Sequence, residues 1–368
     1  MIACLSTNGP SVCHLAAPPT RLLVATLTGL DIIEREKPGA PWIRKSHVLD
    51  GQHVSALMMP PGGNGIFASI HNGKILHSSD GGQTWATRDT GVSAQHIFSL
   101  GFCEHAGGVT LYAGSEPVSL FRSNNNGATW EELPAIQNVP GHETWTFPPP
   151  PHLAHTKSYL FDSQNPDVFY VAIEQGALLK TTDGGKSWRE LDGFFRPDDV
   201  WPKDVHRVVR DPKNPERIFL VTGTGLYRSD DSGENWTHVT TMSFRIGYPD
   251  QLIFSPQNPN TFFMSGAERD PRTWRQSHEA HGTVLRSSDD GATWQEANNG
   301  LPNTGRANIE AMNAAVYPGG FTLFAGNTDG EIYASDDSGA NWIRIVSGLK
   351  PVSKGGHFRN LQDAPAAA

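Results

Sequence analysis

Seven polar side chains occupy equivalent positions along this chain, and most are of the types that transfer protons or bind metals. Six of them stand eight residues before the end of a short β-rich run such as LMMPP or LGFCE, and the C-terminal segment GGHFRNL supplies the seventh. A structure without a site would fill such positions with Val, Ala or Ser, so the pattern predicts a functional polar cluster. The seven residues are His53, His96, His155, Asp204, Tyr248, Glu310 and His357.

The histidines of this set are candidate ligands of a transition metal. Neutral imidazole suits Fe, Zn, Mn or Cu, and carboxylates can complete or orient the coordination shell. A metal held in this way would activate water or polarise a carbonyl. The alternative is that these residues are hydrated and joined by hydrogen bonds, and the sequence leaves both readings open. The predicted metal ligands are His53, His96, His155 and His357.

A second set of candidates lies two residues further along some of the same runs, and therefore on the same side of each strand. It includes Lys157, His206 and Arg359, which can bind a substrate carboxylate or stabilise developing negative charge. Histidine and carboxylate neighbours can act as general acid and base. The predicted catalytic residues are Asp204, His206, Tyr248, Glu310, Lys157 and Arg359.

The elements that must position these groups are marked by an eight-residue pattern of the form S/T-x-D/N-x-G-x-T/S/N-W. Within it the acidic or amide residue can accept turn N–H groups, the Gly permits a positive φ, and the Trp can bury a large face. Trp42 follows a turn-like segment and marks a seventh, degenerate copy. The six clear copies end at Trp85, Trp130, Trp188, Trp236, Trp294 and Trp342.

This pattern resembles the BNR, or Asp-box, repeat of sialidase-like proteins and photosystem II assembly factors. The resemblance implies that each box is the hairpin turn between the third and fourth strands of a β-propeller blade. It predicts an all-β fold, with residues 1–368 forming a single seven-bladed β-propeller of four-stranded blades. The acidic residues of the boxes are then expected to hold turns together and not to bind metals.

The first repeat begins at RLLVATL and lacks a first strand. We therefore predict that the C-terminal tail supplies the first strand of blade one and closes the ring, which removes exposed sheet edges. The predicted blades cover roughly residues 20–50 with 355–362, then 51–92, 93–136, 152–194, 203–242, 248–300 and 307–350.

Two long insertions, residues 137–155 and 266–282, fall on the predicted face of the ring that the box turns do not occupy. Binding sites usually lie on such loops, so we place the site at this mouth. His71, Glu116 and Glu174 follow or end predicted second strands there. The insertions are expected either to cover the site or to pack on the rim.

Composition excludes several partners. With 29 Lys and Arg against 38 Asp and Glu, and no apolar run long enough to cross a bilayer, the sequence predicts neither a nucleic acid nor a membrane partner. The first residues lack a basic stretch followed by an apolar one, and the three cysteines are scattered. We therefore expect a cytoplasmic protein without a disulfide framework, with a Cys4–Cys13 bridge left open.

We favour an enzyme, a hydrolase or a lyase, that acts on a small organic or sugar-like molecule in the central channel, and that is metal-dependent if the histidines bind an ion. A non-catalytic binding or assembly scaffold and a BNR-type glycoside hydrolase are the alternatives. A sialidase is disfavoured, because the nearest string to its early Arg-Ile-Pro motif is FRIG at Phe244–Gly247. Photosystem II assembly factors usually carry an export signal and an arginine patch, and neither is evident in this sequence.

Overall fold

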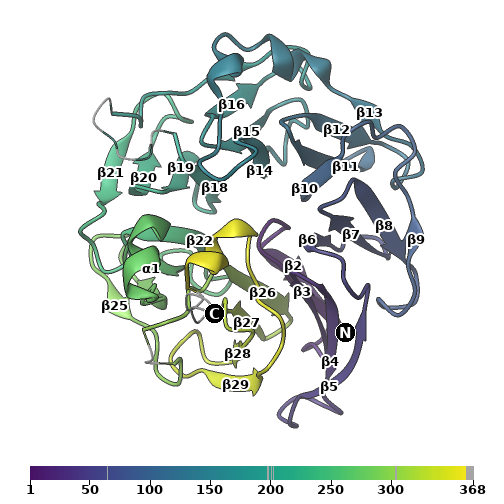
Figure 1. The fold of residues 1–368 in the computed structure, drawn as a ribbon, viewed down its shortest axis with the longest axis vertical. Coiled ribbons are helices and arrows are strands. Elements are labelled where there is room, and N and C mark those ends of the chain that lie inside the picture. Colours follow the sequence, from purple (N-terminus) through teal and green to yellow (C-terminus); the bar gives the residue numbers. More distant parts are fainter. Residues whose placement is uncertain (64, 197–198, 200, 202, 303–304, 362–368) are drawn as a thin grey trace, which may run out of the picture.

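The computed structural model describes residues 1–63, 65–196, 199, 201, 203–302 and 305–361, and of His357 only the backbone. Seven β-sheets stand around a central axis (Figure 1), which confirms the predicted seven-bladed propeller of four-stranded blades. Helices within the described ranges are short, and none of them has the length and apolar composition needed to cross a bilayer. They are η1 (Pro134–Asn138), η2 (His142–Thr144), α1 (Pro271–Ser277) and η3 (Gly356–Leu361).

Each sheet runs outward from an innermost strand beside the axis. The first three blades consist of β1 (Ile2–Leu5), β3 (Arg21–Thr26), β4 (Gly29–Glu34) and β5 (Ile43–Val48); β6 (Val54–Met58), β7 (Ile66–Ile70), β8 (Lys74–Ser78) and β9 (Ala86–Thr87); and β10 (His96–His105), β11 (Gly108–Glu116), β12 (Leu120–Ser123) and β13 (Glu131–Glu132).

The remaining blades follow the same plan, and the last has a fifth strand. They consist of β14 (His155–Phe161), β15 (Phe169–Glu174), β16 (Ala177–Thr181) and β17 (Arg189–Glu190); β18 (Val205–Asp211), β19 (Asn214–Thr222), β20 (Gly225–Ser229) and β21 (Thr237–Thr240); β22 (Tyr248–Phe254), β23 (Phe262–Ala267), β24 (Thr283–Ser287) and β25 (Gln295–Glu296); and β2 (Val12–His14), β26 (Ala311–Tyr317), β27 (Gly320–Gly326), β28 (Ile332–Ser335) and β29 (Ile343–Val346).

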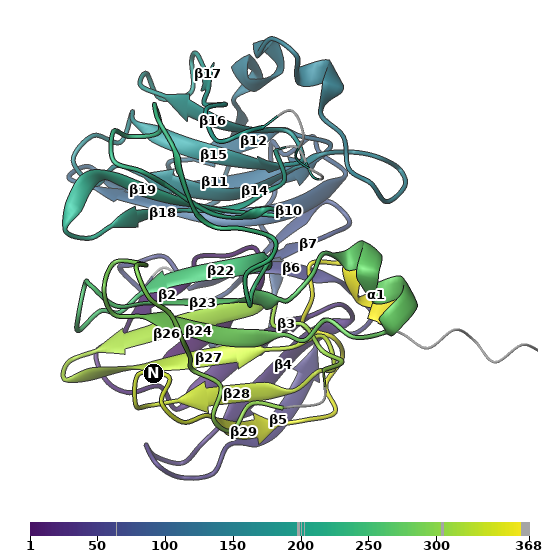
Figure 2. The ribbon, with the colours of Figure 1, turned by 90° about the vertical axis from the view of Figure 1, so that its left-hand side faces the viewer.

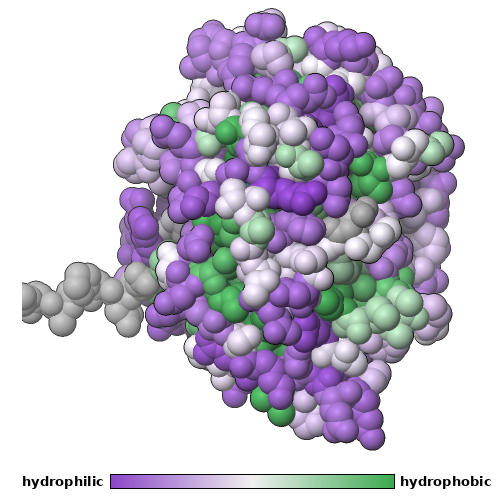
Figure 3. Space-filling view, turned by 90° about the vertical axis from the view of Figure 1, so that its right-hand side faces the viewer, coloured by the Kyte–Doolittle hydropathy of each residue, from purple (hydrophilic) through white to green (hydrophobic). Residues whose placement is uncertain are grey.

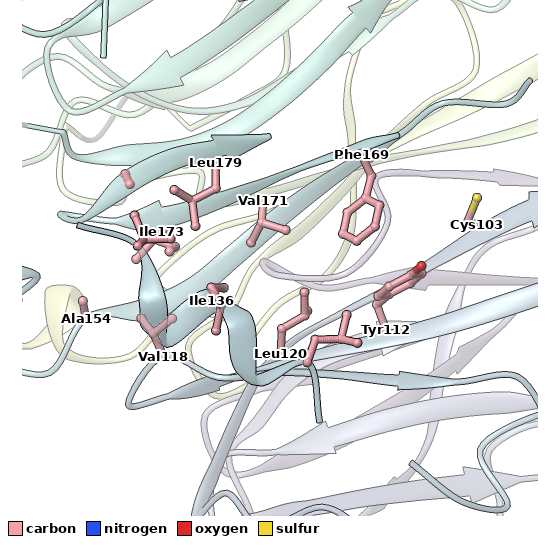
Figure 4. Close-up of a cluster of buried hydrophobic side chains, with 13 residues drawn as sticks. Cys103, Tyr112, Val118, Leu120, Ile136, Ala154, Phe169, Val171, Ile173 and Leu179 are labelled. Atoms are coloured by element: carbon pink, nitrogen blue, oxygen red, sulfur yellow. The ribbon is translucent and has the colours of Figure 1, made fainter. Parts of the chain in front are cut away.

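The hydrophobic core lies between neighbouring blades. Because each central strand is covered by a sheet on both faces, its residues are apolar almost continuously. Between blades three and four, Tyr112 and Leu120 pack against Phe169 and Leu179 (Figure 4). Hydrophilic residues cover most of the outer side drawn in Figure 3. Among the described large hydrophobic residues, those classed as exposed are Met1, Ile43 and Ile343.

The eight-residue turns are built as their residue types predict. In blade two, Asp80 Oδ1 accepts the N–H groups of Gln83 and Thr84, both at 3.0 Å, and Oδ2 accepts the Thr84 hydroxyl at 2.6 Å. The Ser78 hydroxyl accepts the N–H of Gly82, whose φ is +91°. These contacts satisfy backbone groups that the tight turn leaves without ladder partners. Equivalent side-chain contacts occur at Asn125, Asp183, Asp231, Asp289 and Asp337.

The innermost strands of blades two to six share a shift in pairing register at the same position. The skipped residues are the ones that lie two beyond the predicted mouth positions, and such bulges re-aim side chains next to functional sites. Strand β26 of blade seven pairs without a shift, and its equivalent residue, Met312, packs into the hydrophobic core. The five skipped residues are Ser55, Phe98, Lys157, His206 and Asp250.

The prediction that the C-terminal tail closes the ring is wrong. Residues 356–361 form the 3-10 helix η3, and β1 supplies the innermost strand of blade one, parallel to β3. The segment Ile2–Leu5 is apolar throughout and buries Ala3 and Leu5 completely, whereas the tail begins with two glycines that weaken a strand. Leu361 is instead buried beside Trp274 of α1.

The N-terminal segment also fills one end of the central channel. Strand β2 pairs with β26 of blade seven (Figure 1), so residues 2–14 hold the first and last blades together. Between β1 and β2, the carbonyl groups of Thr7, Gly9 and Pro10 accept hydrogen bonds from polar side chains of the innermost strands. Arg207 donates to Thr7 O at 3.1 Å and to Gly9 O, Gln251 donates to Thr7 O, and Asn313 donates to Pro10 O at 2.8 Å.

All three cysteines are free in this arrangement, so the Cys4–Cys13 bridge that the sequence left open is not formed. Burial raises the pKa of the Cys13 thiol to about 11, and it raises that of Cys4 as well. Both thiols are therefore held in the protonated, unreactive form.

We expect Arg207→Met to weaken the N-terminal clasp, here defined as residues 2–14. The guanidinium is buried, and hydrogen bonds from a charged group typically contribute 1.5–3 kcal/mol, so the free energy of unfolding should fall by about 2 kcal/mol. Urea denaturation followed by circular dichroism measures this change. Arg344→Met is the control, because Arg344 is exposed and pairs with Glu331 at the surface, and it should change little. Equal stability of both variants would contradict the clasp.

We also expect Asp183→Asn to lower the melting temperature at neutral pH but not in acid. Hydrogen bonds from Ser187, at both its hydroxyl and its N–H, and from Thr181 lower the pKa of Asp183 from 3.8 to about 2. A carboxyl whose folded pKa is depressed stabilises the fold above its unfolded pKa, and this stabilisation is lost as the pH falls through the folded value. The difference from wild type should therefore shrink between about pH 4 and pH 2 in thermal scans. Asp192→Asn, at an exposed position in the same blade, is the control, and a pH-independent difference for Asp183→Asn would contradict this account.

Candidate functional site at the channel mouth

A cavity of about 440 Å³ opens at the end of the ring opposite the box turns. The pairing of β6, β7 and β8 places His53 and His71 at this end and the turn after Ser78 at the other. Residues 147–153 of the first insertion and residues 354–359 cover the cavity. Helix α1 of the second insertion packs against η3, and both lie on the same side of the ring in Figure 2. The predicted placement of both insertions at one mouth is confirmed.

Glu174 is the centre of the buried polar cluster beneath this cavity. It ends β15 and is 1% exposed. Its Oε2 lies 2.6 Å from His155 Nε2 and 2.8 Å from Lys157 Nζ, and its Oε1 lies 3.6 Å from Lys354 Nζ. Burial alone would raise the pKa of Glu174, but the charges of Lys157 and Lys354 and the contact with His155 hold it well below its usual range. Burial is the main cause that lowers the pKa of Lys157 to about 8.

Glu116 brings a second carboxylate to His155, and it faces the cavity. It ends β11 with 12% of its side chain exposed, and its Oε2 lies 3.3 Å from His155 Nδ1. His71 Nε2 lies 3.9 Å from its Oε1. Burial would raise the pKa of Glu116, but hydrogen bonding with His155 and His71 outweighs it and lowers the pKa to about 2. Burial would likewise lower the pKa of His155, and the two carboxylates raise it instead.

Lys354 joins the C-terminal segment to the cluster. Its ammonium lies 2.6 Å from Asp250 Oδ1, and Asn308 donates to the other Asp250 oxygen at 2.9 Å. Glu310 Oε2 accepts the backbone N–H of Lys354 at 2.7 Å and the Ser353 hydroxyl at 3.0 Å. Burial, followed by repulsion from Asp250, raises the pKa of Glu310. Glu310 therefore anchors the segment after blade seven and does not face the cavity.

The structure brings four of the six predicted catalytic residues together and places Glu310 and Arg359 elsewhere. Lys157, His206 and Asp204 surround Glu174, with His206 Nε2 3.5 Å from Glu174 Oε1 and 3.4 Å from Asp204 Oδ1. Tyr248 donates to Asp204 Oδ2 at 3.4 Å, and burial raises its pKa well above the usual range. Arg359 is exposed on η3, where it lines the cavity from above and not from a strand register.

The described histidines of the predicted metal set do not form a ligand group. The His71 ring contacts both His53, at 5.1 Å between centroids, and His96, at 4.8 Å. His96 Nδ1 bonds to the carbonyl of His71, and the ring of Phe98 packs on His155. Burial and the proximity of His71 lower the pKa of His53 to about 3. His357 lies in η3, so its strand position was wrong, and its side chain is outside the described part of the chain.

Sequence reasoning missed three residues of the cluster: Asn308, Ser353 and Lys354. They lie just before and just after blade seven, outside the strand alignment from which the other candidates came. A lysine followed by two glycines is an ordinary surface-loop sequence, and only the three-dimensional path of the chain brings it over the axis.

Comparisons with known proteins agree with a BNR-type, sialidase-like propeller. A family model described as Sortilin-Vps10 (sortilin, neurotensin receptor 3) matches residues 176–313. The chain is 27% identical over 223 residues to a xyloglucanase from Paenibacillus sp, a match that covers 50% of this chain and 20% of that enzyme. It is 24% identical over 243 residues to the photosystem II assembly lipoprotein Ycf48 from Synechococcus sp. (strain CC9902), covering 62% and 65% of the two chains.

The chain is also similar in fold to solved structures of a xyloglucanase and of YCF48. The GH74 xyloglucanase from Xanthomonas campestris superposes with a TM-score of 0.63 at 16% identity, covering 94% of this chain and 55% of that one. YCF48 bound to D1 peptide superposes with a TM-score of 0.53 at 15% identity, covering 84% and 92%. Such identities show the fold alone. The chain spans a fifth to about a third of the length of the first xyloglucanases that it matches in sequence.

We expect Glu174→Gln to destabilise the fold strongly. The change leaves His155, Lys157 and Lys354 crowded without their shared counter-charge, and removing one partner of a buried ion pair costs about 3–5 kcal/mol. Urea denaturation at neutral pH gives the free energy of unfolding.

Glu190→Gln is the matched control for this prediction, because Glu190 lies in the same blade and pairs with Lys203 at a partly exposed site. Its loss should cost less than about 1 kcal/mol. If the two variants are equally stable, Glu174 does not organise the mouth.

Proposed function

We propose that this chain is a hydrolase or lyase that acts on a small oligosaccharide bound in the mouth cavity. The observation that carries the proposal is the contact chain His71–Glu116–His155–Glu174 along the cavity, with His71 and Glu116 as its partly exposed members. It places an ionised carboxylate next to imidazole groups, and these are side chains that accept and donate protons in general acid–base catalysis. We also propose that the protein acts in the cytoplasm, as expected from its sequence.

The shape and lining of the cavity support a sugar-like substrate. Its volume of about 440 Å³ lies in the usual range for small-molecule sites, roughly 300–1,000 Å³. Phe98, Phe147 and Phe358 line it and offer apolar faces for sugar rings, while Glu116 and His71 can bind hydroxyl groups. The similarity to xyloglucanases in part of the chain favours the same substrate class.

In hydrolysis, Glu116 accepts a proton from the attacking water as the new C–O bond forms. The glycosidic C–O bond breaks, and the leaving oxygen takes its proton from His71, which is 29% exposed in the cavity. In a lyase reaction Glu116 would instead remove a proton from carbon; a C=C bond would form as the neighbouring C–O bond breaks, and the leaving oxygen would again take a proton from His71. His155 acts as a positioning residue, because it holds Glu116 from the buried side and is itself anchored by Glu174.

A non-catalytic binding scaffold is the second candidate. The similarity to YCF48 supports it, because the structural match covers 92% of that chain, which is a protein bound to a peptide. In this case the cavity would accept part of a partner, with the exposed Arg359 available for an acidic group.

The first experiment tests turnover of xyloglucan-derived oligosaccharides and of a set of 4-nitrophenyl glycosides, with products identified by mass spectrometry. Glu116→Gln should lower kcat/KM at least about 100-fold, because it removes a proton acceptor while keeping the side-chain shape. Glu104→Gln is the control, since Glu104 is exposed near the far end of the same blade, on β10.

Turnover that survives Glu116→Gln would contradict the assigned role of this residue. If the wild-type protein turns over none of these substrates, the enzyme proposal fails and the scaffold is favoured. Titration with a peptide that bears an acidic C-terminus, with Arg359→Ala as the weakened variant, then tests the scaffold.

A further inference from the structure

Three buried side chains beneath the mouth aim atoms that lack hydrogen bonds at one another, and Lys354 Nζ lies 3.6 Å from one of them, Glu174 Oε1. Glu174 Oε1, Asp204 Oδ1 and His206 Nε2 form no hydrogen bond with any described residue. Each of these side chains is at most 2% exposed, and the three atoms lie within 4.8 Å of one another. Leaving three buried polar atoms without hydrogen bonds at one point is costly, and such groups call for a physical explanation.

The hydrogen bond of His206 Nδ1, on the side of the ring away from Glu174 and Asp204, determines that Nε2 faces these carboxylates. His206 Nδ1 lies 2.6 Å from the carbonyl oxygen of Pro249, which can only accept, so Nδ1 carries the proton. Nε2 is then the ring atom that faces the two carboxylate oxygens, which is the position from which an imidazole binds a metal ion. A ligating histidine commonly donates its other N–H to a backbone carbonyl in this way.

The spacing of His206 Nε2 from each of the two carboxylate oxygens fits a metal ion. Bonds of about 2.0–2.1 Å in a tetrahedral site place the ligand atoms about 3.4 Å apart. His206 Nε2 lies 3.4 Å from Asp204 Oδ1 and 3.5 Å from Glu174 Oε1. We propose that Glu174, Asp204 and His206 bind one divalent transition-metal ion, with Zn²⁺ as the best fit. One imidazole with two carboxylates suits such ions, whereas Ca²⁺ and Mg²⁺ prefer oxygen ligands alone.

The two carboxylate oxygens of Glu174 have different neighbours, so one can bind the proposed ion while the other pairs with cationic side chains. Oε2 pairs with His155 and Lys157, and Oε1 faces His206. Lys354 lies 3.6 Å from Oε1, but its ammonium is closer to Asp250, at 2.6 Å, and this carboxylate offsets its charge.

The proposed ion has a supported coordination shell. Tyr248 donates to the second oxygen of Asp204, which leaves Oδ1 aimed at His206. Asp204 lines a small cavity of about 60 Å³ and Glu174 lines the large one, so the proposed site lies between two cavities while its ligand atoms are buried. This site differs from the predicted four-histidine set and does not depend on the proposed hydrolysis.

The experiment measures metal binding by the full chain directly. The purified protein is stripped with a chelator, dialysed, and titrated with Zn²⁺ or Co²⁺, and bound metal is counted by mass spectrometry. The wild type should bind about one ion per chain. His206→Gln and Asp204→Asn should weaken binding at least about 100-fold, since even changes outside the coordination shell cost 10–100-fold.

Two control variants locate the ion. His14→Gln removes an exposed histidine, and His96→Gln removes a histidine of the other predicted set, and both should bind as the wild type does. Loss of binding in His96→Gln would move the ion to the mouth histidines and overturn the proposal. So would unchanged binding in a folded His206→Gln.

A measurement on the wild type alone covers the case in which the substituted proteins fail to fold. Binding to the native state raises the melting temperature with ligand concentration. Zn²⁺ should therefore raise the melting temperature of the stripped protein in a concentration-dependent manner, and equal Mg²⁺ should not. Co²⁺ should give the visible absorption of a four- or five-coordinate ion. Absence of bound metal at saturating Zn²⁺ would overturn the proposal.

Discussion

The mouth of this propeller is organised by one electrostatic constraint, the charge of a carboxylate that water does not reach. Removing an ionised group from water costs several kcal/mol unless positive partners replace the lost hydration. Glu174 obtains these partners from its own blade through His155 and Lys157, and from the segment after the last blade through Lys354. Satisfying one charge therefore joins blade four to the C-terminal segment. The position of that segment in turn defines the roof of the cavity.

The seven-bladed ring was predictable from the sequence because a repeated turn leaves a repeated signature. Glycine at positive φ, an acidic side chain for the turn amides and a Trp for the sheet interface are needed in each copy. Counting back from the ends of the strands also found Lys157, Asp204 and His206, since equivalent strands start at the same mouth. The count could not show the register shifts, because a bulge depends on the pairing of two strands.

The errors have a common physical origin, which is that pairing between distant segments leaves no local mark. Nothing in Ile2–Leu5 distinguishes an inner strand of blade one from any other short apolar run. GGHFRNL has a strand-like alternation, yet it forms a short helix against α1, where Leu361 is buried. For the same reason Arg359 lines the cavity from η3 and not from a strand. Met312, which was expected at the mouth of the channel, is instead part of the hydrophobic core. One scaffold supports enzymes and binding proteins alike, so function must be argued from the mouth.

The N-terminal clasp has a consequence for how the chain is made. The backbone N–H of Ser6 donates a hydrogen bond to the side chain of Asn313, 307 residues later, and β2 pairs with β26. During synthesis on the ribosome, residues 12–14 emerge long before β26, and they can pair with it only when blade seven has left the exit tunnel. The earlier blades can pack in order as they appear. The pairing of β2 with β26 is therefore the step that completes the ring. In a nascent chain stalled before residue 311, β2 has no partner strand.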